Sequence, residues 1–301
     1  MVQALTEKGV PVRAVLHRPG GDRPQTGVGP EVCYADVRDA ASWPRTMEGV
    51  DVVLHLVAVI RERRGLTFER VNHQGTANVV EAARQAGVQR VVQLSAVGAA
   101  NDPSFPYLQS KWRGEEAVVH GGVPYTIIRS TVLFGDGDEF ITTLAGVVKA
   151  SPVVPIPGDG KTQFQPLHVQ DLAKCIVQAL DREDLRGRTV EVGGPTYMTY
   201  EEIIDTIAKT YGIRRRNVHM PMPIMRRLVW MMEKTLPHPP ATSHQLRMLA
   251  ANNVTQQDAV RRMFGFTPRA MGDNIDYISR ISYTDALRTL LGFAPRRMRS
   301  H

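Results

Sequence analysis

The segment RVNHQGTANVVEAARQAGVQRVVQLSAVGA, residues 70–99, combines the two patterns that decide the fold. Its first part predicts a long amphipathic helix, because apolar residues recur at helical spacing until Gly87, a residue type that often ends helices. Its second part, residues 88–97, is a short apolar run of the kind that forms a strand buried on both faces. A helix followed directly by a buried strand is part of the repeating unit of a parallel sheet.

The same alternation extends in both directions from this segment. Apolar, strand-like runs occupy residues 10–16, 31–37, 49–59 and 123–134, and a further helix is predicted over residues 107–120. Near-continuous runs of Val, Ile and Leu separated by helices are typical of a parallel sheet that helices cover on both faces. The sequence therefore predicts an α/β fold of the Rossmann type, with a doubly wound parallel sheet.

The composition of the chain and the length of its predicted elements change near residue 150. Residues 151–160, SPVVPIPGDG, concentrate Pro and Gly, and the elements expected beyond them are shorter and end in a helical third. We therefore predict a first domain over residues 1–155. A smaller, mostly helical C-terminal lobe is expected over residues 156–301, partly interwoven with the first domain.

Composition excludes several classes of protein. The two cysteines, Cys33 and Cys175, are far apart and lie outside any Cys-x-x-Cys pattern, which argues against a disulfide scaffold or a structural zinc site. No His, Asp and Glu residues have the spacing of metal ligands, so no metal site is predicted. The formal net charge of +7 permits attraction to anionic partners. Because no nucleic-acid-binding motif accompanies this charge, nucleic acid is not an expected partner.

A Met-rich, basic segment at residues 220–236 is predicted to be helical. It could line a hydrophobic substrate pocket, face a protein partner, rest on a membrane surface, or pack as a core helix of the small lobe. No apolar run in the sequence is long enough for a membrane span. We expect a cytoplasmic protein, with peripheral contact at the inner face of a membrane as an option through residues 220–236.

Tyr107 and Lys111 lie one helical turn apart, so their side chains share a face of the predicted helix. A nearby cation lowers the pKa of a phenol, and such a pair can move a proton to or from a hydroxyl or carbonyl oxygen. Ser95 closes the strand before this helix, at the edge of the sheet where α/β proteins bind ligands. The alternatives are a solvated helix face for the pair and a serine that closes its own turn.

These residues resemble the short-chain dehydrogenase/reductase family in its extended and atypical branches, which are epimerase/dehydratase-like and NmrA-like. Ser95, Tyr107 and Lys111 match three positions of the family's catalytic tetrad, and Asn72 matches the helix asparagine that completes it. The similarity extends to about residue 270 through GDGKTQFQPLHVQDLAKCIVQAL and EVGGPTYMTYEEII. The segment LPHPPATSHQLRMLAANNV, residues 236–254, is most similar to relatives of the nucleotide-binding accessory subunit of respiratory complex I.

The resemblance implies a bound NADP(H) more than NAD(H). NAD-preferring members carry an acid at the end of the second strand, whereas this strand ends in Leu16-His17-Arg18-Pro19, and a guanidinium suits a 2′-phosphate. The alternative for Arg18 is a surface arginine in a loop. Asp36 matches a family position near the adenine amino group, although it could equally cap the helix that follows. The residues expected to bind the cofactor are Arg18, Asp36, Val37, Leu56, Val57, Ala58 and Lys111.

The family's fold starts with a strand and a glycine-rich turn whose backbone amides receive the pyrophosphate at a helix N-terminus. No G-x-G-x-x-G or G-x-x-G-x-x-G pattern occurs in this sequence, and residues 1–8 have the pattern of the second half of a helix stopped by Gly9. We expect roughly 15–20 further residues, encoded upstream of Met1, to supply that strand and turn. A chain that has lost its phosphate-binding loop is the alternative.

Two classes of function remain open on the sequence. The matching Ser95, Tyr107 and Lys111 favour an NADP(H)-dependent oxidoreductase or epimerase/dehydratase-type enzyme acting on an unidentified small molecule. The segment 236–254 favours a non-catalytic NADP(H)-binding accessory, assembly or sensor protein with a protein partner. Ser130 stands where the family usually has proline, which leaves the contacts to the nicotinamide open.

Overall fold

The computed structural model describes residues 1–17, 30–63 and 65–293 of the chain. They divide into two compact units, which are described separately. The first unit comprises Met1–Ser130 and Leu172–Glu191, and the second comprises Thr131–Asp171 and Val192–Ser300. The chain therefore leaves the first unit after Ser130, returns to it at Leu172, and leaves it again after Glu191.

The first unit contains a four-stranded sheet with the strand order β10-β5-β4-β3, and β3, β4 and β5 run parallel. Its strands are β1 (Arg13–Leu16), β2 (Glu31–Tyr34), β3 (Val52–His55), β4 (Arg90–Ala96), β5 (Tyr125–Ser130) and β10 (Arg188–Val192). Its helices are α1 (Val2–Glu7), η1 (Ala40–Ser42), α2 (Pro44–Met47), η2 (Glu69–His73), α3 (Gln74–Gln85), α4 (Pro106–Val119), α6 (Val169–Ala179, from Leu172 onward) and η3 (Glu183–Leu185).

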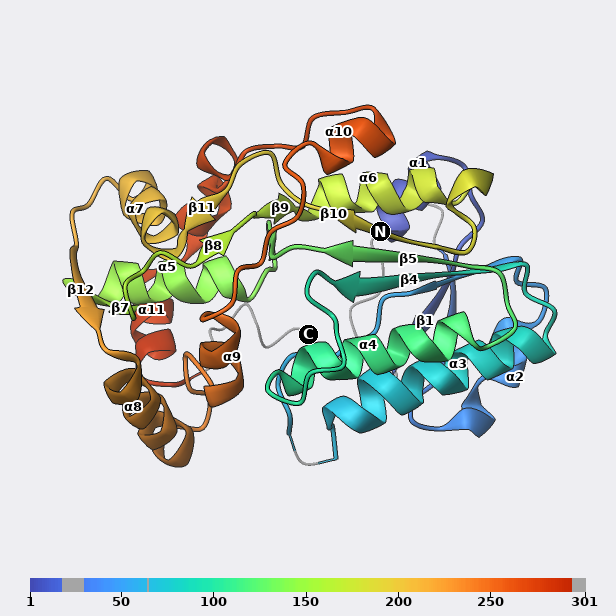
Figure 1. Ribbon diagram of the computed structural model, residues 1–301, viewed down its shortest axis with the longest axis horizontal. Helices are drawn as coiled ribbons and strands as arrows, with labels where there is room; N and C mark the ends of the chain where they lie inside the picture. The colour runs from blue at the N-terminus through green and yellow to red at the C-terminus, as the bar shows by residue number, and fades with distance from the viewer. Residues whose placement is uncertain (18–29, 64, 294–301) are drawn as a thin grey trace. The chain divides into compact units, whose positions relative to one another are not determined.

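Helices cover both faces of this sheet. Helices α3 and α4 lie on one side of β4 and β5, and α6 lies on the other side together with α1 (Figure 1). The contact between α1 and α6 includes Lys8, whose ammonium pairs with Asp181 and donates to the carbonyl oxygen of Val177. This arrangement confirms the predicted doubly wound α/β class.

The apolar pattern of the sequence explains the core under the sheet. Val80 and Ala83 of α3 pack with Val118 of α4 against Val91 and Ile127, which are fully buried in the middle of β4 and β5. Strands buried on both faces need side chains that are apolar without alternation, and β4 and β5 have this composition. The helix predicted over 107–120 is α4, within one residue at each end.

Strands β1 and β2 form a separate parallel pair, with Arg13 opposite Glu31. Val15 of β1 and Val53 of β3 nevertheless pack against one buried cluster, which includes Val79 of α3. Val53 is only partly buried although β3 is as apolar as its neighbour β4. Within the described residues, the edges of β1 and β3 have no further strand partner, so the apolar layer is incomplete at this point.

The second unit has shorter elements around its own core. Its strands form three pairs, β6 (Leu133–Phe134) with β9 (Leu167–His168), β7 (Val153–Pro157) with β12 (Arg216–Met220), and β8 (Gln163–Phe164) with β11 (Met198–Thr199). Its helices are α5 (Phe140–Ala150), α7 (Tyr200–Thr210), α8 (Met222–Thr235), α9 (Ser243–Met248), α10 (Ala259–Phe264), η4 (Met271–Asp273), η5 (Asp276–Arg280) and α11 (Tyr283–Leu290). The single strand predicted over 123–134 is therefore interrupted, because β5 ends at Ser130 and β6 starts at Leu133.

Arg90 at the start of β4 fixes the chain that follows α6. Its side chain is fully buried, and its guanidinium donates to the carbonyl oxygens of Leu180 and Arg182 and to Thr126 Oγ1 at 3.3, 2.9 and 2.6 Å. Desolvation lowers the pKa of Arg90, and the neighbouring charge of Arg186 adds to this effect. The cation is thus held by backbone carbonyls at the end of a helix, where positive charge is favoured.

We predict that Arg90→Met destabilises the protein by about 1–3 kcal/mol, because the two carbonyl groups lose their buried donors. Chemical denaturation measures the difference. Arg188→Met, which removes an exposed arginine from β10 of the same unit, is the matched control and should change the free energy of unfolding by less than about 0.5 kcal/mol. Equal effects of the two substitutions would show that the buried contacts of Arg90 contribute nothing.

Candidate functional site

The π turn η2 places Asn72 inside the first unit, where the side chain is 1% exposed. Its Oδ1 accepts the Val59 amide at 2.8 Å, and its Nδ2 donates to the Val59 carbonyl oxygen and to Ser110 Oγ, both at 3.0 Å. One amide side chain therefore connects the loop after β3 with the first turns of α4. The wider π turn is what brings this side chain inward, since it interrupts the regular spacing of an α-helix.

Helix α4 packs directly on the backbone of Asn72. A methyl group at Gly114 would lie 2.5 Å from the Asn72 carbonyl oxygen, so any larger residue there would push the helix away. The same carbonyl oxygen accepts a hydrogen bond from Thr76 Oγ1 at 2.7 Å. Because Tyr107 and Lys111 lie on α4, this close approach determines where their side chains stand.

Ser95 lies near the carboxyl end of β4, opposite Arg129 of β5, and is 2% exposed. Its Oγ is buried and has no hydrogen-bond partner among the described residues. A buried hydroxyl without a partner costs free energy, and such groups in native proteins commonly mark a ligand or an ordered water. Ser95 therefore fits a position that a bound molecule completes.

Lys111 is also buried and lies next to Ser95. Its Nζ donates to the carbonyl oxygen of Leu94 at 2.7 Å. Burial lowers the pKa of Lys111 to about 8, and the nearby carboxylate of Glu115 opposes this shift. A lysine with this pKa changes its charge within one or two pH units of neutrality.

Tyr107 packs edge-on against Phe68, with ring centroids 5.8 Å apart. Burial raises the pKa of Tyr107 to about 12. The sequence suggested that the Lys111 ammonium would lower this pKa, but Lys111 points to the Leu94 carbonyl and burial dominates instead. Tyr107 is therefore protonated at neutral pH and is suited to donate a proton.

Hydrogen bonds connect Asn72 with the backbone of Tyr107 through Ser110, and a separate bond places Lys111 beside the end of β4. Asn72 donates to Ser110, whose hydroxyl in turn donates to the carbonyl oxygen of Tyr107 at 2.7 Å. Lys111 contacts the residue that precedes Ser95. Residues far apart in the sequence thus meet at the carboxyl ends of β3 and β4. Ser110 and Gly114 were not among the residues predicted for the site, although a glycine in the middle of a helix is a signal of close packing.

His55 of β3 lies beneath this cluster. Its Nε2 is 3.0 Å from Thr76 Oγ1, and burial, aided by the charge of Lys111, lowers its pKa to about 3. The imidazole is therefore neutral at physiological pH. His55 is thus a hydrogen-bonded residue of the core.

Asp36, expected near the adenine, follows β2 and forms an ion pair with Arg38. The Arg38 guanidinium contacts both carboxylate oxygens, with a shortest distance of 2.6 Å, and its backbone amide donates to Oδ1 at 2.9 Å. These bonds lower the pKa of Asp36 to about 2. The helix cap at this point is made by Asp39, which accepts the amide of Ala41, and not by Asp36.

The other residues expected to bind the cofactor fall into three groups. Val37 has its side chain in the buried core, and Asn78 Nδ2 donates to its carbonyl oxygen at 2.8 Å. The apolar residues Leu56, Val57 and Ala58 are exposed directly after β3, at the edge of the sheet that also carries Ser95. Arg18 lies outside the described residues.

Comparison with known proteins agrees with this geometry. The sequence profile of the NAD dependent epimerase/dehydratase family matches residues 1–193. The chain belongs to this family. Its fold is that of NAD(P)-binding proteins. The match also confirms the predicted resemblance, since relatives of the complex I accessory subunit are among the similar sequences.

Two curated relatives illustrate the range of the similarity. The "NADH dehydrogenase [ubiquinone] 1 alpha subcomplex subunit 9, mitochondrial" of Arabidopsis thaliana is 32% identical over 193 residues, which cover 64% of this chain and 48% of that protein. The "Ceramide reductase" of Caulobacter vibrioides is 30% identical over 226 residues, which cover 74% of this chain and 70% of that protein. The chain thus spans about half the length of its complex I relative.

Solved structures share the fold at low identity. The NADPH-dependent quinone oxidoreductase QOR2 of Escherichia coli, solved with NADPH, superposes with a TM-score of 0.76 at 15% identity and covers 93% of this chain and 95% of its own. MoeE5, solved with UDP-glucose and NAD, gives a TM-score of 0.68 at 20% identity, with 93% of each chain covered. Proteins with this fold therefore include one solved with NADPH and one solved with NAD.

The residues present fit the reacting end of a dinucleotide. The unpartnered Ser95 hydroxyl, the buried Lys111 and the exposed apolar loop 56–58 all lie at the carboxyl edge of the sheet. The sequence holds no G-x-x-G-x-x-G turn for the pyrophosphate. In the described part of the chain, no three or more His, Cys, Asp or Glu side chains are grouped so that they could hold a metal ion.

We predict that Lys111 makes stability depend on pH between about 8 and 10.4, its folded and unfolded pKa values. In this window the unfolded chain retains a proton that the folded chain has released, so stability rises with pH. Below pH 8 both states are charged, and the cost of burying the ammonium is fully present. Relative to Lys111→Met, wild-type stability should therefore rise by up to about 1.4 kcal/mol per pH unit across the window.

Denaturation curves at several pH values for wild type and Lys111→Met measure this difference. Lys174→Met, at an exposed position of α6 in the same unit, is the matched control for the loss of one positive charge. A stability difference between wild type and Lys111→Met that does not change with pH would mean that the ammonium is not desolvated in the folded protein.

Proposed function

We propose that this chain is an NADP(H)-dependent reductase or epimerase/dehydratase-type enzyme that acts on a small molecule. The observation that carries the proposal is the buried, unpartnered hydroxyl of Ser95 next to Leu94, whose carbonyl oxygen accepts a hydrogen bond from the buried Lys111. A merely structural cluster would satisfy its own polar atoms. The family to which the chain belongs supports the same class of chemistry.

Each group at the proposed site has a distinct chemical role. A bound dinucleotide supplies or accepts a hydride, which is chemistry that side chains cannot provide. The Tyr107 hydroxyl donates a proton to a substrate carbonyl oxygen or takes one back, and the Ser95 hydroxyl donates a hydrogen bond to the same oxygen. Because burial keeps Tyr107 protonated at neutral pH, its hydroxyl is in the form that donates a proton when a carbonyl is reduced. Lys111, with a pKa of about 8, donates to the Leu94 carbonyl oxygen and contributes positive charge to the site near neutral pH.

A second candidate function is a non-catalytic accessory, assembly or sensor protein that binds NADP(H). The specific support is the similarity to the complex I subunit of Arabidopsis thaliana. In this function the bound dinucleotide stabilises the first unit, and the side chains at the tetrad positions bind the dinucleotide without catalysing a reaction. The two candidate functions differ in whether the Tyr107 hydroxyl is needed.

We predict that Tyr107→Phe lowers turnover by about 10²–10⁴-fold while dinucleotide binding changes little, because only the proton-transferring hydroxyl is removed. The native protein is incubated with NADPH and panels of quinones, enones, sugar nucleotides and ceramides, and the absorbance of NADPH and the products are followed. Tyr125→Phe is the matched control, because Tyr125 is the first residue of β5 and lies away from the carboxyl edge of the sheet.

If no substrate turns over and Tyr107→Phe complements a deletion strain as well as wild type does, the accessory function replaces the enzymatic one. Loss of turnover in Tyr107→Phe together with full activity in Tyr125→Phe establishes catalysis.

We also propose a preference for NADPH over NADH, based on Arg18, which follows β1 in the sequence and lies outside the described residues. Asp36, the acid that follows β2, is paired with Arg38. The Arg38 cation therefore offsets the negative charge that Asp36 would otherwise present to a 2′-phosphate. We predict that Arg18→Ala weakens NADPH binding by about one to two decades and leaves NADH binding nearly unchanged, because a charge-assisted contact to the 2′-phosphate is lost.

Calorimetric titration of the native protein with each dinucleotide measures the ratio of the two affinities. Arg45→Ala, an exposed arginine of α2 in the same unit, controls for the loss of one positive charge. An NADPH/NADH ratio that stays the same in Arg18→Ala would assign Arg18 to the solvent-facing surface.

A further inference from the structure

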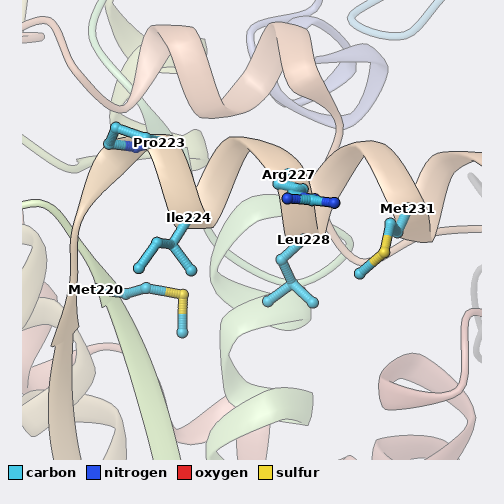
Figure 2. Close-up of a pocket in the computed structure, with 6 residues that line it drawn as sticks. All are labelled: Met220, Pro223, Ile224, Arg227, Leu228 and Met231. Carbon is cyan, nitrogen blue, oxygen red and sulfur yellow. The ribbon is translucent and has the colours of Figure 1, made fainter.

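Helix α8 of the second unit carries an open apolar groove on one side. The groove has a volume of about 510 Å³ and is lined by Met220, Pro223, Ile224, Arg227, Leu228 and Met231. Figure 2 shows that Ile224, Leu228 and Met231 point to the same side of α8, where Met220 of β12 also lies. We call these six residues the α8 groove. Five of them are apolar and the sixth is a cation.

The opposite side of α8 attaches the helix to its own unit. Met225 and Val229 are buried there and pack with Leu246 of α9. Two groove residues, Met220 and Leu228, are partly buried against this cluster. Two others remain in solvent, since Ile224 is 57% exposed and Met231 46% exposed. Such a contiguous apolar surface usually serves an interaction.

Positive charge predominates around the α8 groove. Residues 211–236 contain six Lys and Arg and a single Glu. That acid, Glu233, is engaged by the backbone amide and hydroxyl of Ser243. In the described parts of the chain, Arg226 and Arg227 make no ion pair, and Lys234 lies 6.0 Å from the ring centre of Trp230. A partner of this surface must accept apolar side chains and supply negative charge.

We infer that the α8 groove docks on the surface of an anionic lipid bilayer. A helix with apolar residues on one side and unpaired arginines beside them lies in the plane of the membrane interface, with its apolar side between the headgroups and the acyl chains. Trp230, which is 56% exposed, is the residue type that favours this depth. Arg227, which lines the groove, can extend toward lipid phosphates while its aliphatic stem covers the apolar side chains.

A second copy of the chain is a poorer occupant of the same surface. Two copies facing each other through α8 would bring together two segments with the same excess of positive charge. In the described residues, no helix has the length and apolar character that crossing a membrane requires, so the contact is peripheral. This inference goes beyond the proposed function and does not depend on turnover.

Vesicle sedimentation tests the inference with the native protein and no substrate. We expect binding to vesicles of phosphatidylcholine with 30% phosphatidylglycerol (about one anionic lipid in three, enough for a negative surface potential). Binding to phosphatidylcholine alone should be weak, and added salt should reduce binding to the anionic vesicles. The fluorescence of Trp230 should shift to the blue on binding, and Trp230→Phe should remove this shift.

Two double variants separate the charged from the apolar contribution. Arg226→Gln with Arg227→Gln should weaken vesicle binding by about 30-fold, which corresponds to about 1 kcal/mol for each arginine near an anionic surface. Ile224→Gln with Met231→Gln should weaken it by at least about 10-fold, because apolar area is no longer transferred from water.

Matched controls lie elsewhere on the second unit. Arg261→Gln with Arg262→Gln removes the same charge from α10, and Tyr283→Gln with Leu291→Gln removes two exposed apolar side chains at α11. Both control variants should bind vesicles as wild type does. Absence of vesicle binding by wild type, or equal losses in variants and controls, would overturn the inference. Self-association that disappears in Ile224→Gln with Met231→Gln would also overturn it and assign the groove to a second copy.

Discussion

The contact between the Asn72 backbone and helix α4 is the constraint on which the candidate site depends. Gly114 allows α4 to approach so closely that one methyl group would collide with the Asn72 carbonyl oxygen. At the same position, the Asn72 side chain holds the loop after β3 and the Ser110 hydroxyl. Three elements are thus fixed by one residue, and the two reactive side chains of α4 take their positions from it. A larger residue at 114 would move Tyr107 and Lys111 together, without touching either of them.

Much of this arrangement was accessible from the sequence, because it depends on local patterns. Buried runs without alternation identified β4 and β5, and helical spacing ended by glycine identified α3. The spacing of Tyr107 and Lys111 on one helix face was also correct. Asn72 could be placed near them only through the family resemblance, since its contacts are with residues 13 and 38 positions away along the chain.

Other features follow from tertiary packing and had no local signal. The π turn at Glu69–His73 replaces a regular start of α3, because packing against α4 decides the backbone there. The direction of Lys111 is another example. Proximity in the helix suggested a pair with Tyr107, but the carbonyl oxygen of Leu94 offers the ammonium a buried acceptor. Desolvation, which depends on the whole surrounding structure, then determines the pKa of both groups in directions that spacing alone does not give.

The polar groups at the site cost the fold free energy, and this cost is an argument for function. A serine hydroxyl without a partner and an ammonium whose pKa has fallen toward neutrality each destabilise the folded chain. Apolar side chains of similar size would pack in the same places without that cost, as they do in the adjacent cluster of Val80, Ala83 and Val91. His55 and Asn72 in the same region show that the fold can satisfy buried polar groups fully. The Ser95 hydroxyl, which has no partner among the described residues, and the desolvated Lys111 ammonium both lie at the carboxyl edge of the sheet, where a ligand can bind them.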